Sequence, residues 1–207
     1  MKKPIVIKKG LSNDMRFDLK DGAGSDAIHV KPVYAYAVCK LVTDSDIEGV
    51  GLAFTLGSGN KIVCQAIEYL VKHVEGKEIY ELMNSFGTTY KQMADDPNFR
   101  WLGPHKGVVQ LALAAVVNAC YDLWAKAEGV PLWKLLIDLS PEQLVNTLDF
   151  SYYEDILPKQ EAIALIKNQR AGITQRESII QTGYPGYDTS IGWFNYSDEQ
   201  IIQNVEA

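Results

Sequence analysis

The pattern of apolar and polar positions divides the chain into a β-rich beginning and a helical remainder. Short apolar stretches at 5–7 and 15–19 predict strands, and two longer β-rich stretches follow at 34–43 and 49–55. Residues 19–33 between them are rich in Gly and turn formers, which predicts a loop. These positions predict an antiparallel meander of about three strands.

Helical periodicity follows the meander. Residues 61–74 place apolar side chains at intervals of four, and residues 80–93 form a second amphipathic stretch that ends before an Asp-Asp-Pro turn. The stretch 107–128 is apolar almost all the way round through Val117, so we expect a helix buried on most sides. Gly129 is placed as its C-cap, and a short helix is predicted up to Leu136. Strands first and helices after predict an α+β unit.

The pattern changes after Leu136. Residues 144–152 predict a strand, and 158–169 and 174–181 predict helices. A Gly- and aromatic-rich segment follows, and a last helix is predicted from Ser197, which has N-cap character.

Composition narrows the possible partners. The 207 residues are 47% hydrophobic and 22% charged, as in an ordinary globular protein. The net charge of −6 argues against nucleic acid as a partner, because phosphate binding requires a basic surface. No apolar run is expected to reach the roughly 20 residues that span a bilayer, so no membrane association is predicted. The two lysines near the start precede only a short apolar patch, and we therefore expect no signal peptide.

The three cysteines lie far apart inside apolar segments, at Cys39, Cys64 and Cys120. This arrangement predicts buried, reduced thiols in a cytosolic or mitochondrial compartment. No two histidines have ligand spacing on one helix face, so a zinc site is not expected.

Several sequence blocks, in this order and at these spacings, carry a resemblance to a known family. They are GSDA at 24–27, GLAFTLGSG at 51–59, RWLGPHKGVVQLA at 100–112, NACYDLWAKAEGVPLWKLL at 118–136 and GYPGYDTSIGWFNYSDE at 183–199. With them, the chain resembles the N-terminal part of the L-fuconate dehydratase family. That family belongs to the mandelate racemase/muconate lactonizing enzyme branch of the enolase superfamily.

The resemblance implies an enolase-like N-terminal capping domain over residues 1–136. Residues 137–207 would then be the first segments of a (β/α) TIM-type barrel. A full barrel takes about 250 residues and eight strands, so the roughly seventy residues after Leu136 form an incomplete one.

The implied activity is that of a Mg²⁺-dependent lyase that dehydrates a sugar acid such as L-fuconate. In the family a Lys in a Lys-x-Lys removes the α-proton, three carboxylates hold Mg²⁺, and a His is paired with an Asp. The resemblance places all of these beyond Ala207, so no catalytic residue and no metal ligand is expected in this chain. We therefore predict that it is inactive alone, and we expect the full-length enzyme to be a homo-oligomer. The alternative is a non-catalytic short product that acts by association with full-length subunits or another partner.

Five residues are candidates for substrate binding. The resemblance assigns Gly24, Ser25 and Asp26 to a substrate-selecting loop, where the glycine permits close approach and the two side chains can hydrogen-bond sugar hydroxyls. The residues alone are also typical of an ordinary connector. Tyr34 is either a substrate contact or a half-buried strand aromatic. Tyr184 is either a sugar-acid contact or a structural loop aromatic.

Three further motifs suggest chemistry but have simpler interpretations. Asp122 and Lys126 are an i, i+4 pair of the kind that stabilises a helix. Arg100, Trp101 and His105 are interpreted as groups that dock and order the loop before the buried helix. The Gly-Ser-Gly at 57–59 lacks the third glycine and the acidic partner of a dinucleotide-binding turn, so nucleotide binding is not expected.

Overall fold

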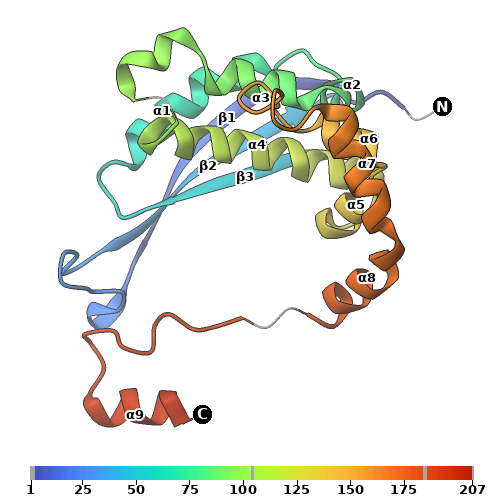
Figure 1. The fold of residues 1–207 in the computed structure, drawn as a ribbon. Coiled ribbons are helices and arrows are strands. Elements are labelled where there is room, and N and C mark those ends of the chain that lie inside the picture. Colours follow the sequence, from blue (N-terminus) through green and yellow to red (C-terminus); the bar gives the residue numbers. More distant parts are fainter. Residues whose placement is uncertain (1–2, 104, 184–185, 207) are drawn as a thin grey trace.

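The computed structural model describes residues 3–103, 105–183 and 186–206. Its three strands form one antiparallel sheet in the order β1-β2-β3 (Figure 1). They are β1 (Ile7–Asp18), β2 (Val33–Thr43) and β3 (Glu48–Thr55). The predicted three-stranded meander is confirmed, with one correction. The stretches 5–7 and 15–19 are not separate strands, because β1 pairs with β2 from Ile7 through Asp18 past a register shift near its start.

Helices make up most of the remaining chain. The α-helices are α1 (Asn60–Leu70), α2 (Ile79–Asn84), α3 (Phe86–Ala94), α4 (Gly107–Glu128), α5 (Leu132–Asp138), α6 (Pro141–Asn146), α7 (Lys159–Gln169), α8 (Ile173–Thr182) and α9 (Asp198–Glu206). Short 3-10 turns lie at Lys20–Gly22, Val71–His73, Pro97–Leu102 and Arg170–Gly172.

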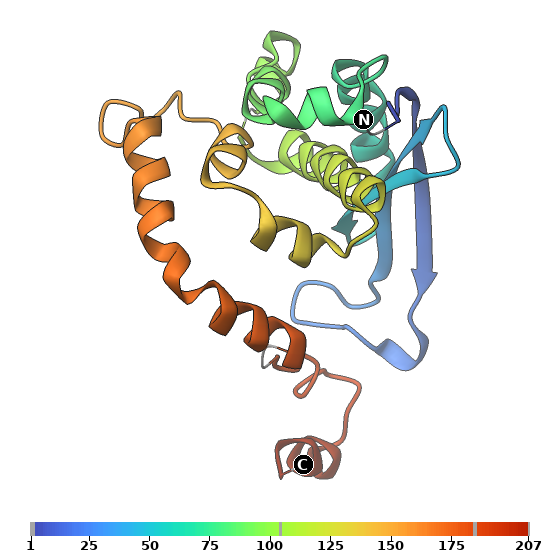
Figure 2. The same ribbon diagram turned by 90° about the vertical axis from the view of Figure 1, so that its right-hand side faces the viewer.

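Helices α1 and α4 cover one face of the sheet, and the side view in Figure 2 shows the helical layer on that side. Alternate residues of β2 and β3 point toward α1 and α4 and are buried, and the residues between them are half-buried or exposed. This alternation is the pattern of a sheet with one covered face. The expected α+β fold of a capping domain is therefore confirmed for the sheet and the helices that cover it.

Two glycines bring the buried helix α4 onto β3 at very short range. A Cβ at Gly51 would lie 2.0 Å from the carbonyl oxygen of Ala115, and one at Gly49 would lie 2.3 Å from that of Ala119. These distances are far below van der Waals contact, so only glycine permits the observed approach of helix to strand.

The pair Asp122 and Lys126 joins α4 to the edge of β3. A carboxylate oxygen of Asp122 accepts from the Lys126 ammonium at 2.6 Å and from the Val50 backbone N–H at 2.7 Å. Lys126 also donates to the Glu48 carbonyl oxygen at 2.9 Å. The pair stabilises its helix as predicted, and it also binds backbone groups that an edge strand leaves unpaired.

Helix α4 corrects the expectation that no run is apolar enough to cross a bilayer. By length and composition alone, its 22 residues meet that test. Val109, Ala112 and Val116 on this helix are fully buried, with 0% of their surface exposed to solvent. The physical reason for its composition is its place between the sheet and the surrounding helices.

Two predicted elements differ from the structure. The helix expected at 80–93 is interrupted at Ser85, whose ψ of 35° is not helical, so that α2 and α3 are separate. A Cβ at Gly87 would lie 2.0 Å from the Leu148 carbonyl oxygen, so α3 is positioned by close packing against a segment distant in sequence.

The strand expected at 144–152 is wrong, because residues Pro141–Asn146 form α6 and turns follow. The Ser140 side chain accepts from the Gln143 backbone N–H, and the Gln143 side chain accepts from the Ser140 N–H, which makes a capping box before Pro141. Within the described residues after Leu136 there are helices and turns and no strand. The expected barrel is thus not seen in this part of the chain.

The segment from α7 to α9 curves away from the sheet and helices (Figure 1). It is attached near α5, where Lys134 lies 2.8 Å from Glu177 of α8 and Arg170 donates to the Leu139 carbonyl at 2.6 Å. The Ser197 hydroxyl accepts from the Gln200 N–H, so the predicted N-cap of α9 is confirmed.

Candidate functional site

The loop between β1 and β2 lies at the end of the hairpin away from the helices that cover the sheet (Figure 1). It runs from Leu19 to Pro32 and begins with the 3-10 turn Lys20–Gly22. The hairpin extends beyond the covered part of the sheet, which places this loop at an outer surface of the molecule.

Gly24 of this loop lies close to Tyr34, near the start of β2. Gly24 has φ of +72°, and a Cβ there would lie 2.9 Å from the Leu19 side chain and 3.1 Å from the Tyr34 hydroxyl oxygen. Only glycine combines this backbone conformation with this approach. Tyr34 is half-buried, and its ring packs edge-on against Phe54 at 4.9 Å between centroids. The loop thus folds back over the end of β2 and leaves the Tyr34 hydroxyl at its inner side.

Asp26 organises the rest of the loop. Its Oδ1 accepts from the backbone N–H groups of Ile28 at 2.8 Å and of His29 at 2.7 Å. The His29 ring Nδ1 lies 3.0 Å from Oδ2, and the Asp26 N–H donates to the His29 carbonyl at 3.0 Å. The neighbouring Ser25 hydroxyl donates to the Val30 carbonyl at 3.0 Å. Residues 25–30 therefore form a turn closed by its own side chains.

The hydrogen bonds to Asp26 lower the pKa of its carboxyl group. The hydrogen bond from the His29 side chain, followed by those from the two backbone N–H groups, lowers the pKa of Asp26 to about 2. Hydrogen bonds to a carboxylate favour its charged form. Asp26 is therefore an anion at every physiological pH, and its remaining lone pairs can accept from hydroxyl groups.

An open hollow of about 440 Å³ lies between the loop and residues 194–195 of the C-terminal segment. It is lined by Gly22, Ser25, Asp26, Ala27, Val30, Phe194 and Asn195. A Cβ at Gly22 would lie 3.6 Å from the Asn195 side chain, so the two segments are in contact. Figure 1 shows the segment before α9 passing below the tip of the hairpin. Gly22 and Asn195, which are 173 positions apart in sequence, thus share one surface.

Of the predicted site residues, Ser25 and Asp26 line this hollow. Gly24 and Tyr34 are close to each other but are not among its lining residues. Tyr184 lies outside the described residues. His29 and Asn195 were not predicted from the sequence. The spacing of Asp26 and His29, three residues apart in a turn-rich loop, was the available signal for His29; nothing local indicated Asn195.

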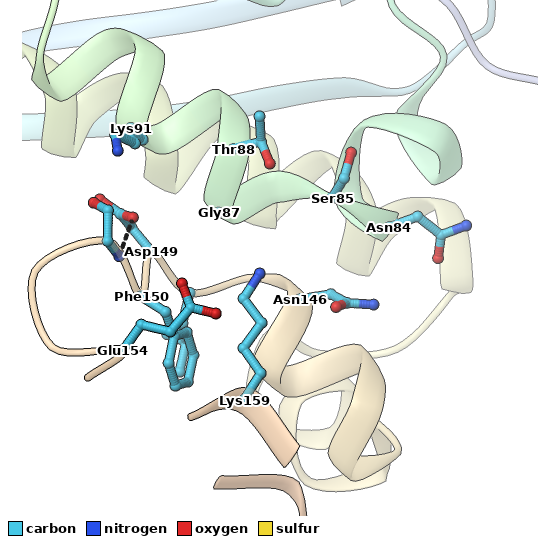
Figure 3. A pocket seen from close by; sticks show the side chains of 12 residues that line it. Asn84, Ser85, Gly87, Thr88, Lys91, Asn146, Asp149, Phe150, Glu154 and Lys159 are labelled. Carbon is cyan, nitrogen blue, oxygen red and sulfur yellow. Dashed lines mark hydrogen bonds between the residues drawn. The ribbon is translucent and has the colours of Figure 1, made fainter. Parts of the chain in front are cut away.

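A second hollow of about 240 Å³ lies between the α2–α3 junction and residues 146–159. Figure 3 shows the side chains of Asn84, Lys91, Asn146, Glu154 and Lys159 arranged around it. Its groups carry both signs of charge, and the Lys159 ammonium lies 5.9 Å from the centre of the Phe150 ring. These features describe a solvated junction between two packed segments.

Among Arg100, Trp101 and His105, the structure shows an ordering contact for His105 within the described residues. The His105 ring nitrogen lies 3.3 Å from Asp95, whose carboxylate also accepts from the Tyr152 hydroxyl at 2.9 Å. Trp101, in the 3-10 turn Pro97–Leu102, is 92% exposed, so its ring is not docked in the described part of the structure. Arg100 lines the adjacent hollow with Asp95 and His105.

The described residues do not fit a magnesium ion. Among them, no three His, Cys, Asp or Glu side chains are grouped so that they could hold a metal. Asp26 already accepts from three donors of its own loop. We therefore assign no step to a metal held by this part of the chain.

Comparison with known proteins identifies the family. Residues 26–136 match the model of the mandelate racemase / muconate lactonizing enzyme N-terminal domain. Mitochondrial enolase superfamily member 1 of Xenopus laevis is 46% identical over 192 residues, which cover 91% of this chain and 43% of the relative. L-galactonate dehydratase of Hypocrea jecorina is 41% identical over 202 residues, which cover 96% of this chain and 45% of the relative. The chain thus spans less than half the length of these relatives.

Solved structures agree with the sequence matches. Human mitochondrial enolase superfamily member 1 superposes with a TM-score of 0.88 at 40% identity, covering 97% of this chain and 46% of the human one. A racemase from Streptomyces coelicolor, solved with bound magnesium, shares the fold with a TM-score of 0.55 at 20% identity. The chain belongs to the mandelate racemase / muconate lactonizing enzyme family of the enolase superfamily, and its sheet and covering helices are the N-terminal domain of that family.

Proposed function

We propose that this chain supplies the substrate-selecting cap of a Mg²⁺-dependent sugar-acid dehydratase that acts on L-fuconate or a close relative. Family membership and the name of the L-galactonate dehydratase relative support the reaction class. The observation that carries the proposal is the hollow between the loop 22–30 and residues 194–195, in which the polar side chains of Ser25, Asp26 and Asn195 lie among apolar ones. The capping domain would comprise residues 1–136, and residues 137–207 would lead into the barrel.

Each predicted residue has a defined task in this proposal. Gly24 allows the loop to approach the Tyr34 hydroxyl, which would bind a sugar hydroxyl next to the hollow. Asp26 keeps the turn in one shape and accepts from a hydroxyl through its remaining lone pairs. Ser25 can accept a hydrogen bond while its own hydroxyl donates to Val30. We extend the proposal to Tyr184 on the family resemblance alone.

The proton-abstracting base and the magnesium ligands would come from a barrel that the described residues do not provide. When bound, Mg²⁺ would supply Lewis-acid stabilisation of the substrate carboxylate. The cap contributes binding, orientation and exclusion of water from the substrate. We propose a cytosolic or mitochondrial location, because the cysteines are unpaired and the Xenopus relative is named mitochondrial.

Titration of the purified 207-residue chain with L-fuconate tests the proposal. We expect amide NMR shifts at residues 22–30 and 194–195, and we expect Tyr34→Phe to weaken them several-fold. Lactate is the matched control ligand, because it has the carboxylate and α-hydroxyl without the sugar chain. Shifts confined to other regions, or equal shifts with lactate, would contradict the proposal.

The same preparation should show no formation of the keto-deoxy product. Loss of base and metal together removes most of the roughly 8 kcal/mol or more by which enzymes lower a barrier. Calorimetric titration with Mg²⁺ should reveal no binding. L-Fuconate turnover in the absence of host enzyme, or a micromolar Mg²⁺ site, would show that the catalytic groups have been misplaced.

A second candidate function is association without catalysis. Several large apolar side chains after Leu136 are exposed, among them Ile156 at 81% and Phe194 at 71%. Apolar surface of this kind is typical of a segment that packs against another protein domain. Co-purification with full-length subunits, without any effect of L-fuconate, would favour this function.

A further inference from the structure

The hollow of about 240 Å³ at the α2–α3 junction is lined by four charged side chains. They are Lys91 of α3, Lys159 at the start of α7, and Asp149 and Glu154 of the turns before α7. Figure 3 shows the Lys159 ammonium and the Glu154 carboxylate pointing from residues 146–159 toward the junction. We call this site the charged hollow.

The four charges of the hollow do not pair with one another. Two of them, Lys159 and Asp149, are half-buried. In the described part of the chain no ion pair joins any of the four to another charged side chain, whereas Lys167 of the same helix α7 pairs with Glu142 at 2.6 Å. Charges withdrawn from water are normally paired. These four are therefore available to a ligand that carries both signs of charge.

The floor of the charged hollow is held by packing. Phe150 is 3% exposed, and the Lys159 ammonium lies over its ring at 5.9 Å from the centre. An aromatic ring attracts a cation at this distance and keeps it near. The contact of Gly87 with the Leu148 carbonyl fixes α3 against the segment that carries Phe150. The charged groups thus stand on a base of fixed shape.

The start of α3 supplies further donors to the hollow. The Ser85 side chain at the N-cap forms no capping hydrogen bond. The first N–H groups of a helix have no partner within the helix, and this end favours negative charge. Ser85 and Gly87 both line the hollow. A carboxylate is therefore favoured between Lys159 and the start of α3, and a cation is favoured beside Glu154.

These charges favour a small zwitterion over a sugar acid. A sugar acid carries a carboxylate and hydroxyl groups but no cation, so it would leave Glu154 and Asp149 unpaired, and an unpaired charge discriminates against a ligand. An α-amino acid carries a carboxylate and an ammonium group on one carbon. The volume lies below the roughly 300 Å³ at which pockets for drug-sized ligands begin, which suits such a small molecule. The hydroxyls of Ser85 and Thr88 favour a polar side chain.

We propose that the charged hollow binds the zwitterion of a small polar α-amino acid. Its carboxylate faces Lys159 and the start of α3, with Lys91 as a second cation, and its ammonium group faces Glu154 and Asp149. The hollow lies among the helices, away from the hairpin loop (Figure 1). The inference therefore does not depend on the proposed substrate or on catalysis.

Titration of the full 207-residue chain with L-serine, followed by amide NMR, tests the proposal. We expect saturable shifts at Gly87, Thr88 and residues 149–154, with a dissociation constant on the order of 1 mM. Acetate lacks the ammonium group and ethylamine lacks the carboxylate, so each should bind at least ten-fold more weakly. L-Fuconate should give no saturable shift at these residues.

Charge-removing variants identify the groups that bind. Lys159→Gln and Glu154→Gln should each weaken L-serine binding at least ten-fold. Lys167→Gln and Glu161→Gln are the matched controls, because they remove the same charges from α7 outside the hollow and should leave binding unchanged. Circular dichroism verifies that each variant is folded. If Lys159→Gln unfolds, Glu154→Gln carries the test, since the Glu154 side chain is exposed and has no described partner.

Three results would overturn the proposal. The first is the absence of a saturable shift at these residues with L-serine up to about 20 mM, well above the expected dissociation constant. The second is equally tight binding of acetate, ethylamine or L-fuconate in the hollow. The third is L-serine binding by the two hollow variants that matches binding by the two controls. Shifts at residues 22–30 report on the proposed sugar-acid site and leave this test unaffected.

Discussion

The Asp26 side chain is hydrogen-bonded mainly to its own loop, which limits what it can offer to a ligand. The sequence suggested a carboxylate that faces a sugar, whereas three of its hydrogen bonds come from Ile28 and His29 of its own turn. Its primary effect is therefore to hold the backbone that lines the hollow. This assigns His29 a part in the site that its position alone did not reveal.

His29→Ala should raise the pKa of Asp26 from about 2 toward its ordinary 3.8, because the ring is the largest cause of the lowering. A lowered carboxylate pKa stabilises the turn above pH 3.8, and that contribution is lost as pH falls toward 2. In the variant the loss should occur at higher pH. The measurement is the pH dependence of the Ile28 and residue-29 amide shifts in NMR spectra, with His73→Ala as a control outside the loop. An unchanged Asp26 titration would contradict the assigned role.

At the scale of elements, the contact of α4 with β3 organises the capping domain. The helix lies so close that the carbonyl oxygens of Ala115 and Ala119 occupy the space of the missing side chains at Gly51 and Gly49. The Asp122–Lys126 pair then fastens the same helix to the strand edge. The two glycines and the ion pair together fix the position of α4 against β3.

Gly51→Ala should destabilise the fold by about 1–3 kcal/mol or more, because the added Cβ would overlap backbone that cannot rotate away. Gly59→Ala is the matched control. A Cβ at Gly59 has nothing within 4 Å, so its effect should stay within about 0.5 kcal/mol. Urea unfolding followed by circular dichroism measures both. Equal stabilities of the two variants would show that α4 is free to move off the strand.

At the scale of the whole molecule, burial is concentrated in the first two thirds of the chain. The main core contains residues from Ile5 to Leu139 and includes all three cysteines. A separate cluster of Val145, Phe150 and Ala162 lies beyond it. Helices α8 and α9 bury no residue of their own in the described structure. The C-terminal part therefore depends on contacts with other surfaces for its stability.

The reactivity of the three cysteine thiols indicates whether the main core stays closed to solvent. Burial raises the pKa of Cys39 to about 12 and also raises the pKa of Cys64 and Cys120, so thiolate is scarce in the native chain. Since the thiolate is the reactive form, all three should react slowly with Ellman's reagent until denaturant is added. Cys64, at 7% exposure, should react first, and Cys64→Ala should remove that phase. Rapid native reaction of Cys39 or Cys120 would show that the core opens.

The sequence by itself determined those features that depend on periodicity and local chemistry. The two strands β2 and β3, the apolar circumference of α4, the Gly129 C-cap and the Ser197 N-cap were all predicted, because each depends on residues close together in the sequence. The matching blocks likewise indicated the family. Candidate site residues within one loop could be named together, since neighbours in a short loop stay close in space.

Only the tertiary structure decided the features that depend on distant partners. The break at Ser85 accompanies the contact of Gly87 with Leu148, and the strand expected at 144–152 had no strand to pair with and began with a helix cap instead. Asn195 joins the site because the chain returns to the hairpin after many intervening residues. The Asp122–Lys126 pair binds the backbone of β3 because tertiary packing places α4 beside that strand. Packing, and not local propensity, selects which surfaces meet.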